Sequence, residues 1–199
     1  MAQLYFKYGA MGSSKSAQAL ITQFNYEELG MTVWLIKPSI DTRDGADIVQ
    51  SRIGLKRSAE VITPEQNIIE AYAKAGRHDV IIADEAQFFT PEQADQLFLV
   101  TVDLGIPVIC YGLRADFMMR GFPGSTRLLE IAHTIEELKT ICTCGRKAIC
   151  NGRKVNGEFV FEGAQVAIDT VDDVEYQSLC PQCWYREYRA FLARHPKAE

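Results

Sequence analysis

A run of small and polar residues near the start of the chain has the composition of a phosphate-binding loop. Residues 9–16 read Gly-Ala-Met-Gly-Ser-Ser-Lys-Ser and lie between a predicted strand and a predicted helix. In such a loop, backbone N–H groups face a phosphate, Lys15 reaches the β and γ oxygens, and the Ser16 hydroxyl coordinates Mg²⁺. Ser14 replaces the second glycine of the pattern, which at a glycine-only backbone position would cost about 1–3 kcal/mol. The alternative is a helix-capping turn with a solvated lysine.

Two adjacent acids follow a strand that should be buried. Residues 79–83 contain a continuous β-branched run typical of a parallel sheet, and Asp84 and Glu85 come directly after it. Because ligands bind beyond the carboxyl ends of parallel strands, these acids should lie beside the phosphate loop. Asp84 would then hold Mg²⁺, and Glu85 would face the group that accepts a phosphoryl. The alternative is a strand end capped by two solvated acids.

Four cysteines in two close pairs have the spacing of a metal site. Cys142 and Cys144 form one pair, and Cys180 and Cys183 form the other, with 35 residues between the pairs. Four thiolates suit a closed, tetrahedral structural Zn²⁺ site. Buried free thiols or a redox pair are the alternatives. The other two cysteines are expected in the core.

The elements that must position these groups alternate between short apolar strands and helix-like stretches. Strands are predicted at residues 4–8, 33–36, 79–83 and 107–111, and helices at residues 17–29, 67–75 and 92–104. The sequence Thr-Pro-Glu-Gln occurs at residues 63–66 and 90–93, and each copy matches a capping box, so a helix should begin after each. The alternation predicts an α/β fold, with a P-loop NTPase-like, mostly parallel sheet and flanking helices.

The chain changes character near residue 135. Beyond it come the cysteine pairs, an Asn156-Gly157 hairpin signal, an acidic stretch and a helix-like tail at residues 184–193. We predict two domains: residues 1–135 as a nucleotide-binding α/β domain and residues 136–199 as a small zinc-binding domain.

Composition sets limits on the class of protein. The chain has 199 residues, 47% of them hydrophobic and 24% charged, which is ordinary for a globular protein and excludes a disordered or fibrous one. The net charge of −5 argues against a nucleic-acid coat protein. No apolar run approaches the roughly 20 residues of a membrane helix. No secretion signal is visible. We therefore expect a cytoplasmic protein with neither a nucleic-acid nor a membrane partner.

Together these residues resemble the type II thymidine kinases, the zinc-containing group of bacteria and the animal cytosol. The resemblance spans essentially the whole chain. It rests on Gly9-Ala10-Met11, Asp41-Thr42-Arg43, Ser51-Arg52-Ile53-Gly54, Asp84-Glu85-Ala86-Gln87-Phe88, Tyr111-Gly112-Leu113-Arg114-Ala115-Asp116-Phe117, and both cysteine pairs with Tyr176 upstream of the second. It implies transfer of the ATP γ-phosphoryl to the 5′-hydroxyl of thymidine or deoxyuridine, with Mg²⁺, a structural Zn²⁺ and a homotetrameric assembly.

The resemblance also implies residue roles. Glu85 would be the general base, with Lys15 and Arg43 on the phosphate side and Asp41 as the partner of Arg43. The residues expected at the nucleotide are Gly9, Ala10, Met11, Gly12, Ser13, Ser14, Lys15, Ser16, Asp84, Glu85, Ala86 and Gln87. Those expected at the substrate are Met11, Asp41, Arg43, Gln87, Phe88, Leu113, Phe117, Phe122 and Tyr176.

A loop within residues 166–176 would close over the base and bind it through main-chain groups, as the resemblance implies. Family members usually carry a Gly-Gly pair there, which this chain lacks. The preference for thymidine over deoxyuridine is therefore left open.

Two other functions fit the same motifs. One is an ATPase or GTPase switch, which would place a water-orienting residue beside Asp84. The other is a nucleotide sensor that carries a zinc-ribbon nucleic-acid module. The negative net charge and the lack of a basic stripe around the cysteines argue against the sensor, whereas the sequence leaves the switch open.

Overall fold

The computed structural model describes residues 1–41, 45, 47–166 and 173–196. Arg43 and most of the loop expected over the base lie outside the described residues. Among the described helices, none combines the length and the apolar character needed to cross a membrane.

A six-stranded sheet forms the first part of the molecule, with the strand order β5-β2-β6-β7-β1-β8. Every neighbouring pair is parallel. The strands are β1 (Leu4–Tyr8), β2 (Val33–Pro38), β5 (Glu60–Ile62), β6 (Val80–Ala83), β7 (Val108–Gly112) and β8 (Thr134–Glu137). Each residue of β6 and β7 is buried, because helices cover both faces of the sheet. The predicted α/β class and parallel sheet are confirmed.

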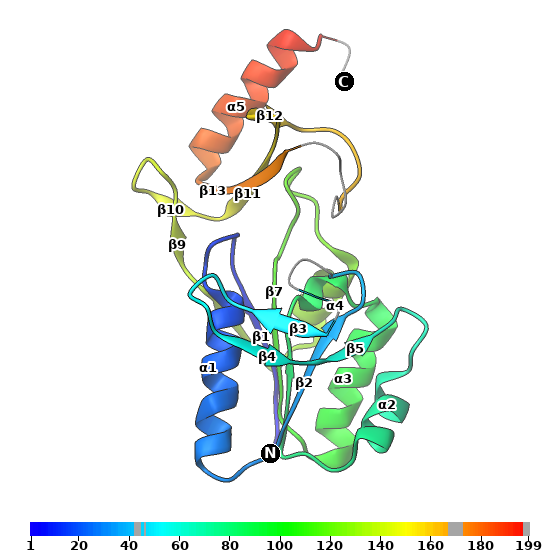
Figure 1. Ribbon diagram of the computed structural model, residues 1–199. Coiled ribbons are helices and arrows are strands. Elements are labelled where there is room, and N and C mark those ends of the chain that lie inside the picture. Colours follow the sequence, from blue (N-terminus) through cyan, green and yellow to red (C-terminus); the bar gives the residue numbers. More distant parts are fainter. Residues whose placement is uncertain (42–44, 46, 167–172, 197–199) are drawn as a thin grey trace.

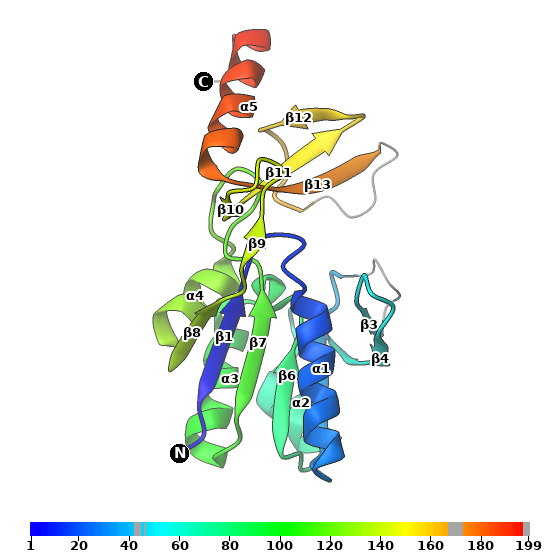
Figure 2. The same ribbon diagram turned by 90° about the vertical axis from the view of Figure 1, so that its left-hand side faces the viewer.

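Helices cover the two faces unequally. Helix α1 (Lys15–Glu28) packs on one face, where Leu20 belongs to the same buried cluster as Leu35 and Ile82. The other face carries α2 (Ile68–Ala75), α3 (Pro91–Leu104) and α4 (Pro123–Ile131), which bury a larger core. Figure 1 shows the sheet between these two layers, and in Figure 2 α1 lies in front of it.

Only one of the two predicted capping boxes forms. Thr90 accepts a hydrogen bond from the Gln93 N–H, and the Gln93 side chain accepts one from the Thr90 N–H, so α3 begins as predicted. The helix predicted at residues 67–75 is confirmed as α2, but Thr63 does not cap it, since α2 begins after Asn67, whose Oδ1 caps the helix. The Gln93 amide donates to the carbonyls of Thr63 and Gln66, at 2.8 and 3.0 Å, and these bonds hold the expected cap as a turn.

In the sequence, a short antiparallel hairpin follows β2 and precedes β5, and it was not predicted. Its strands are β3 (Ile48–Gln50) and β4 (Lys56–Ser58). Val49 packs into the core beneath α1, whereas the residues of β4 are exposed. This pattern buries too few apolar residues to stand out in the sequence.

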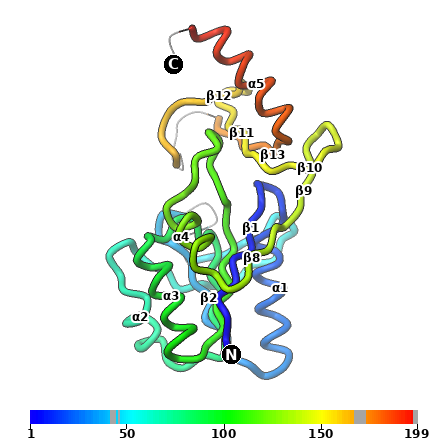
Figure 3. The backbone as a smooth tube through the Cα atoms, turned by 180° about the vertical axis from the view of Figure 1, so that it is seen from behind, coloured from blue at the N-terminus to red at the C-terminus, as the bar shows by residue number. Residues whose placement is uncertain are grey.

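The C-terminal part has its own strands and core. It comprises β9 (Thr140–Ile141), β10 (Lys147–Ala148), β11 (Cys150–Val155), β12 (Glu158–Val160), β13 (Val174–Leu179) and α5 (Pro181–Arg194). Asn156 and Gly157 both have positive φ, of 51° and 83°, as a two-residue hairpin turn requires. Figures 1 and 3 show this part above the carboxyl ends of the sheet strands.

The boundary expected at residue 135 falls inside β8, which pairs with β1 in the main sheet. Leu138, just beyond β8, is buried in the core beneath α1. We therefore propose that the two domains divide after Leu138. The remaining two cysteines are buried in cores, Cys110 in the first part and Cys150 in the second, as expected.

Candidate active site and metal centre

The phosphate loop connects β1 to α1 at the carboxyl end of the sheet. The buried Lys15 ammonium donates to the carbonyls of Gly9 and Ala10, at 3.2 and 3.1 Å, which fixes the shape of the loop. At Gly9 only glycine fits, because a Cβ there would collide with the Ser13 side chain and the Leu138 carbonyl. Ser14 has a φ of 60°, so this position does require the left-handed backbone that a glycine would adopt freely.

Asp84 sits at the end of β6, beside the start of α1. Its carboxylate is buried and hydrogen bonded to Ser16, while its Oδ1 has no hydrogen-bond partner among the described residues. Burial, and then the adjacent Glu85 carboxylate, raise the pKa of Asp84 to about 7. A buried, unpartnered carboxylate oxygen next to a hydroxyl is a donor set that fits Mg²⁺, which prefers oxygen ligands.

Two cavities meet beside these groups. The larger, of about 400 Å³, runs along the phosphate loop from Gly12 to Ala17 and reaches the residues that follow β3. The smaller, of about 50 Å³, lies between the main sheet and the C-terminal part. Three residues line both cavities: Met11, Glu85 and Leu113. Glu85 is thus the only carboxylate among the described residues to line both of these cavities.

Glu85 is held by a neighbour on the same turn. It adopts a left-handed backbone, with φ 49°, at the start of the short 3-10 helix η1 (Ala86–Phe88). The Gln87 side-chain amide donates to Glu85 Oε2, and Gln87 Oε1 accepts the Leu113 N–H at 2.9 Å. The end of β7 therefore fixes Gln87, and Gln87 in turn fixes the carboxylate. A non-glycine residue in this backbone region is a marker of strain at functional sites.

The smaller cavity gathers most of the residues expected at the substrate. Its walls include Met11, Gln87, Phe88, Leu113, Phe117, Phe122 and Tyr176. Phe88 and Phe122 meet edge to face, with ring centroids 5.6 Å apart. Aromatic and aliphatic walls with a few polar groups suit a flat, mostly apolar ring.

Several expected residues do not line either cavity. Asp41 is buried and forms a 3.0 Å ion pair with Lys37, and its expected partner Arg43 lies outside the described residues. Some residues expected at the nucleotide belong to the phosphate loop or lie near it but line neither of the two cavities. They are Gly9, Ala10, Ser13, Asp84 and Ala86.

Three polar residues line the smaller cavity although no role was predicted for them. Asp116, Asn151 and Gln165 line it, and Gln165 donates to Asp116 Oδ2 at 3.0 Å. Asp116 belongs to a motif that carries the family resemblance but received no role from it. Asn151 and Gln165 carried no signal, because each lies in a segment whose pattern is that of an ordinary strand or turn.

Arg153 is also buried, although it lies on a short strand where a charge would normally face solvent. It donates to the Tyr176 hydroxyl at 3.0 Å and to the carbonyls of residues 164 and 165, at 2.8 and 2.9 Å. Its guanidinium carbon lies 3.7 Å from the centroid of the Phe117 ring. Arg153 therefore supports two walls of the cavity and the segment that leads into the loop.

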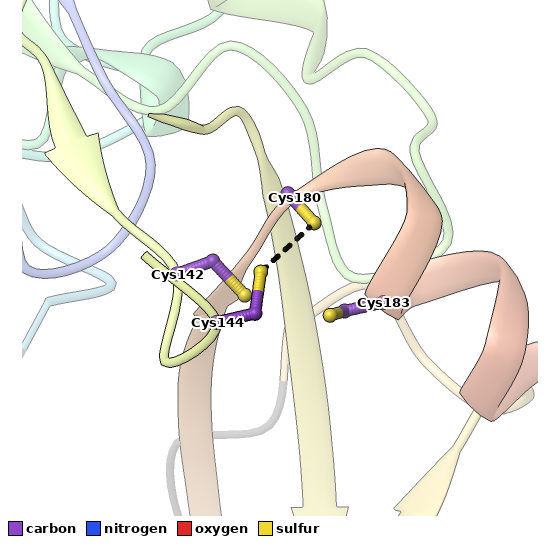
Figure 4. A group of neighbouring side chains, drawn as sticks. All are labelled: Cys142, Cys144, Cys180 and Cys183. Carbon is purple, nitrogen blue, oxygen red and sulfur yellow. Dashed lines mark hydrogen bonds between the residues drawn. The ribbon is translucent and has the colours of Figure 1, made fainter. Parts of the chain in front are cut away.

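The four paired cysteines converge as predicted. Cys142 and Cys144 come from the turn between β9 and β10, and Cys180 and Cys183 from the start of α5, with all four sulfur atoms within 4.8 Å of one another. Figure 4 shows the four side chains directed toward one point. Tetrahedral Zn–S bonds of about 2.3 Å would place the sulfur atoms roughly 3.8 Å apart. The 3.6 Å between the Cys144 and Cys180 sulfurs fits this geometry, so the cluster could hold a zinc ion.

A phosphate loop and a strand-end acid pair beside an aromatic cavity define an enzyme of phosphoryl transfer on a P-loop-type sheet. Comparison with known proteins makes the assignment specific. The family model described as thymidine kinase matches residues 2–184, and the chain belongs to this family.

Individual relatives agree over nearly the full length. The thymidine kinase of Enterobacteria phage T4 is 45% identical over 92% of this chain and 96% of its own. That of Francisella tularensis SCHU S4 is 39% identical over 92% and 97%, and that of Legionella pneumophila strain Paris is 46% identical over 84% and 83%. Among solved structures, the Pif1 helicase of Candida albicans aligns with a TM-score of 0.42 and 16% identity, over 70% of this chain and 36% of that one.

Proposed function

We propose that this protein is a thymidine kinase that transfers the γ-phosphoryl of ATP to the 5′-hydroxyl of thymidine or deoxyuridine. The observation that carries the proposal is the position of Glu85, which lines both the phosphate-side and the aromatic cavity. A group that joins two substrates must lie where their sites meet. The family membership and the names of the relatives support the choice of substrates.

Glu85 acts as the general base. Its carboxylate takes the proton of the 5′-hydroxyl as the oxygen forms a bond to the γ-phosphorus, and the bond from that phosphorus to the β–γ bridging oxygen breaks to release ADP. Gln87 holds the carboxylate in place through its hydrogen bond to Oε2. This arrangement directs the base at a nucleoside hydroxyl on the aromatic side rather than at water.

The phosphate loop binds and orients the triphosphate. Its backbone N–H groups and the N-terminus of α1 face the phosphates, and Lys15 contributes a positive charge. Ser16 and Asp84 would hold Mg²⁺, as the unpartnered Asp84 oxygen supports. When bound, Mg²⁺ supplies positive charge that offsets the charge on the phosphate oxygens. Arg43, with Asp41 as its proposed partner, is assigned to the same side by family resemblance alone.

The aromatic cavity binds the nucleoside. The rings of Phe88, Phe117 and Phe122 would enclose the base, and Tyr176 would lie near the sugar and the base. The loop within residues 166–176 would add main-chain hydrogen bonds to the base edge. Arg153 supports the proposed position of this loop, since it donates hydrogen bonds both to the Tyr176 hydroxyl and to the Ala164 carbonyl, just before the loop begins.

The C-terminal part is stabilised by Zn²⁺ on Cys142, Cys144, Cys180 and Cys183. In such small units, the free energy of metal binding stabilises the folded state, because the unfolded chain has no preformed metal site. The zinc therefore has a structural role and takes no part in the reaction. What supports the proposal is the convergence of the four sulfurs and the buried aromatic core beside them.

We also propose that the enzyme works in the cytoplasm as a homo-oligomer, a tetramer by family resemblance, without nucleic-acid or membrane partners. The half-exposed apolar side chains of Ile21 and Phe24 on α1 support an assembly between copies. Light scattering of the purified protein would give the subunit number.

The decisive experiment measures ADP release from Mg-ATP with and without thymidine. Glu85→Gln should lose at least about 100-fold in turnover while ATP binding stays near that of the parent, because a general base is removed without a change in shape. Glu65→Gln, which changes an exposed acid, is the matched control. Release that does not depend on thymidine would favour a nucleotide switch, and unchanged turnover in Glu85→Gln would reject the proposed base.

A further inference from the structure

The side chain of Asn151 bridges two segments of the main sheet domain from the C-terminal part. Its Oδ1 accepts the Met11 N–H at 2.8 Å, and its Nδ2 donates to the Ala115 carbonyl at 2.9 Å. Asn151 itself is only 4% exposed, whereas Met11 and Ala115 are partly buried. Met11 and Asn151 are 140 positions apart in the sequence, and this contact exists only through the tertiary fold.

Asn151 joins the phosphate loop to a wall of the aromatic cavity. Met11 belongs to the phosphate loop and lines both cavities, whereas Ala115 lies between Leu113 and Phe117, which line the aromatic cavity. Asn151 itself lines only the aromatic cavity. One amide therefore sets the position of the phosphate loop against the wall of the nucleoside site.

Asn151 is held in place by the pairing of β11 with β13. Asn151 pairs with Ser178 of β13, and its neighbour Cys150 pairs with Leu179, the residue before Cys180 of the metal cluster. The strand is thus tied to the cysteine cluster that α5 completes. A displacement of the cysteine cluster would therefore be transmitted along β11 to Met11 through the Asn151 side chain.

Few side chains could replace Asn151. The Met11 backbone N–H is a donor and the Ala115 backbone C=O is an acceptor. The bridging side chain must therefore offer an acceptor atom and a donor atom side by side, as a carboxamide does. Removal of the amide would leave the partly buried Met11 N–H and Ala115 C=O without this partner, which destabilises the arrangement of the two segments.

We propose that Asn151 is a positioning residue that holds the phosphate loop and the wall of the aromatic cavity in the arrangement that binds both the nucleotide and the nucleoside. The proposal rests on the proposed kinase function. It requires that loss of the amide weakens the binding of both substrates. This includes the nucleotide, although Asn151 does not line the larger cavity at the phosphate loop.

The test measures the binding of a non-hydrolysable Mg-ATP analogue without nucleoside, and of thymidine without nucleotide, by titration calorimetry. In Asn151→Ala both dissociation constants should rise by about 3- to 10-fold, the range expected for a lost buried hydrogen bond. Lys154→Ala, on the same strand but outside both cavities, should bind both ligands as the parent does. If only thymidine binding weakens, Asn151 merely lines the cavity and the proposal is overturned.

Amide hydrogen exchange provides a second measurement that needs no substrate. The Met11 N–H should exchange at least about threefold faster in Asn151→Ala than in the parent, with the same zinc content in both proteins. Equal exchange would contradict the proposal. Should Asn151→Ala not fold, Asn151→Ser serves instead, because its shorter hydroxyl cannot span both backbone groups. A parent that binds no ATP analogue would reject the kinase function, and the exchange result would still decide the role of Asn151.

Discussion

Gln87 donates a hydrogen bond to the carboxylate of Glu85 and accepts one from the Leu113 N–H, so the proposed base is anchored to the end of β7. Glu85 and Leu113 line both cavities, and Gln87 lines the smaller one. The position of the base thus depends on a neutral side chain that itself takes no proton. This relationship leads to the first prediction.

Gln87→Ala should lower kcat by about 10-fold, because Glu85 loses its orienting donor and the buried Leu113 N–H loses its acceptor. The affinity for the ATP analogue should stay within about twofold of the parent, since Gln87 lies outside the larger cavity. Steady-state kinetics with both substrates checks this prediction. Gln182→Ala, at an exposed position on α5, is the control and should keep the parent's kcat. An unchanged kcat in Gln87→Ala would show that Glu85 needs no such support.

Asp84 should give the metal-free protein a measurable dependence of stability on pH. Its pKa is raised to about 7 when folded, above the ordinary value of 3.8, so the folded state holds the proton more tightly than the unfolded chain. The contribution to the free energy of unfolding is therefore full below about pH 4 and is lost as the pH rises toward 7.

Denaturant unfolding at several pH values measures this effect. Asp84→Asn should remove the part of the slope between pH 4 and 7 that belongs to this carboxyl. Asp103→Asn, at an exposed position, should keep the parent's slope. Identical slopes in Asp84→Asn and the parent would mean that the folded protein does not retain that proton.

Ser14→Gly should stabilise the protein by up to about 1 kcal/mol, because glycine adopts the left-handed backbone of this position without a Cβ clash. Ser14 makes no side-chain capping hydrogen bond, so the substitution removes none. Ser14→Ala retains the Cβ and should give no such gain. Thermal unfolding of the three proteins checks the prediction, and equal gains in both variants would contradict the backbone explanation.

Cys183→Ala should lower the zinc content from about one ion per chain to near zero and destabilise the protein by about 4 kcal/mol or more. Elemental analysis and chemical unfolding measure the two effects. Cys150→Ala is the matched control, because it removes a buried thiol from the same core but not from the cluster of four. A chelator should reproduce the Cys183→Ala behaviour in the parent. Retention of zinc by Cys183→Ala would exclude a four-cysteine site.

The sequence alone determined the features that depend on local pattern. The buried run before Asp84 predicts a parallel strand because its residues are apolar on both faces, and the position of Asp84 and Glu85 at the strand's carboxyl end follows from that. The spacing of the cysteine pairs likewise predicts a metal cluster, since four soft ligands have few other uses together.

Tertiary structure decided the features that depend on partners far along the chain. Asn67 rather than Thr63 caps α2 because Gln93 of the next helix occupies two carbonyls of the expected cap. The buried positions of Asn151 and Arg153 arise because β11 lies against the phosphate loop and the aromatic cavity. A polar side chain looks the same in the sequence whether it faces water or a distant backbone group, and only the packing of the two parts tells these cases apart.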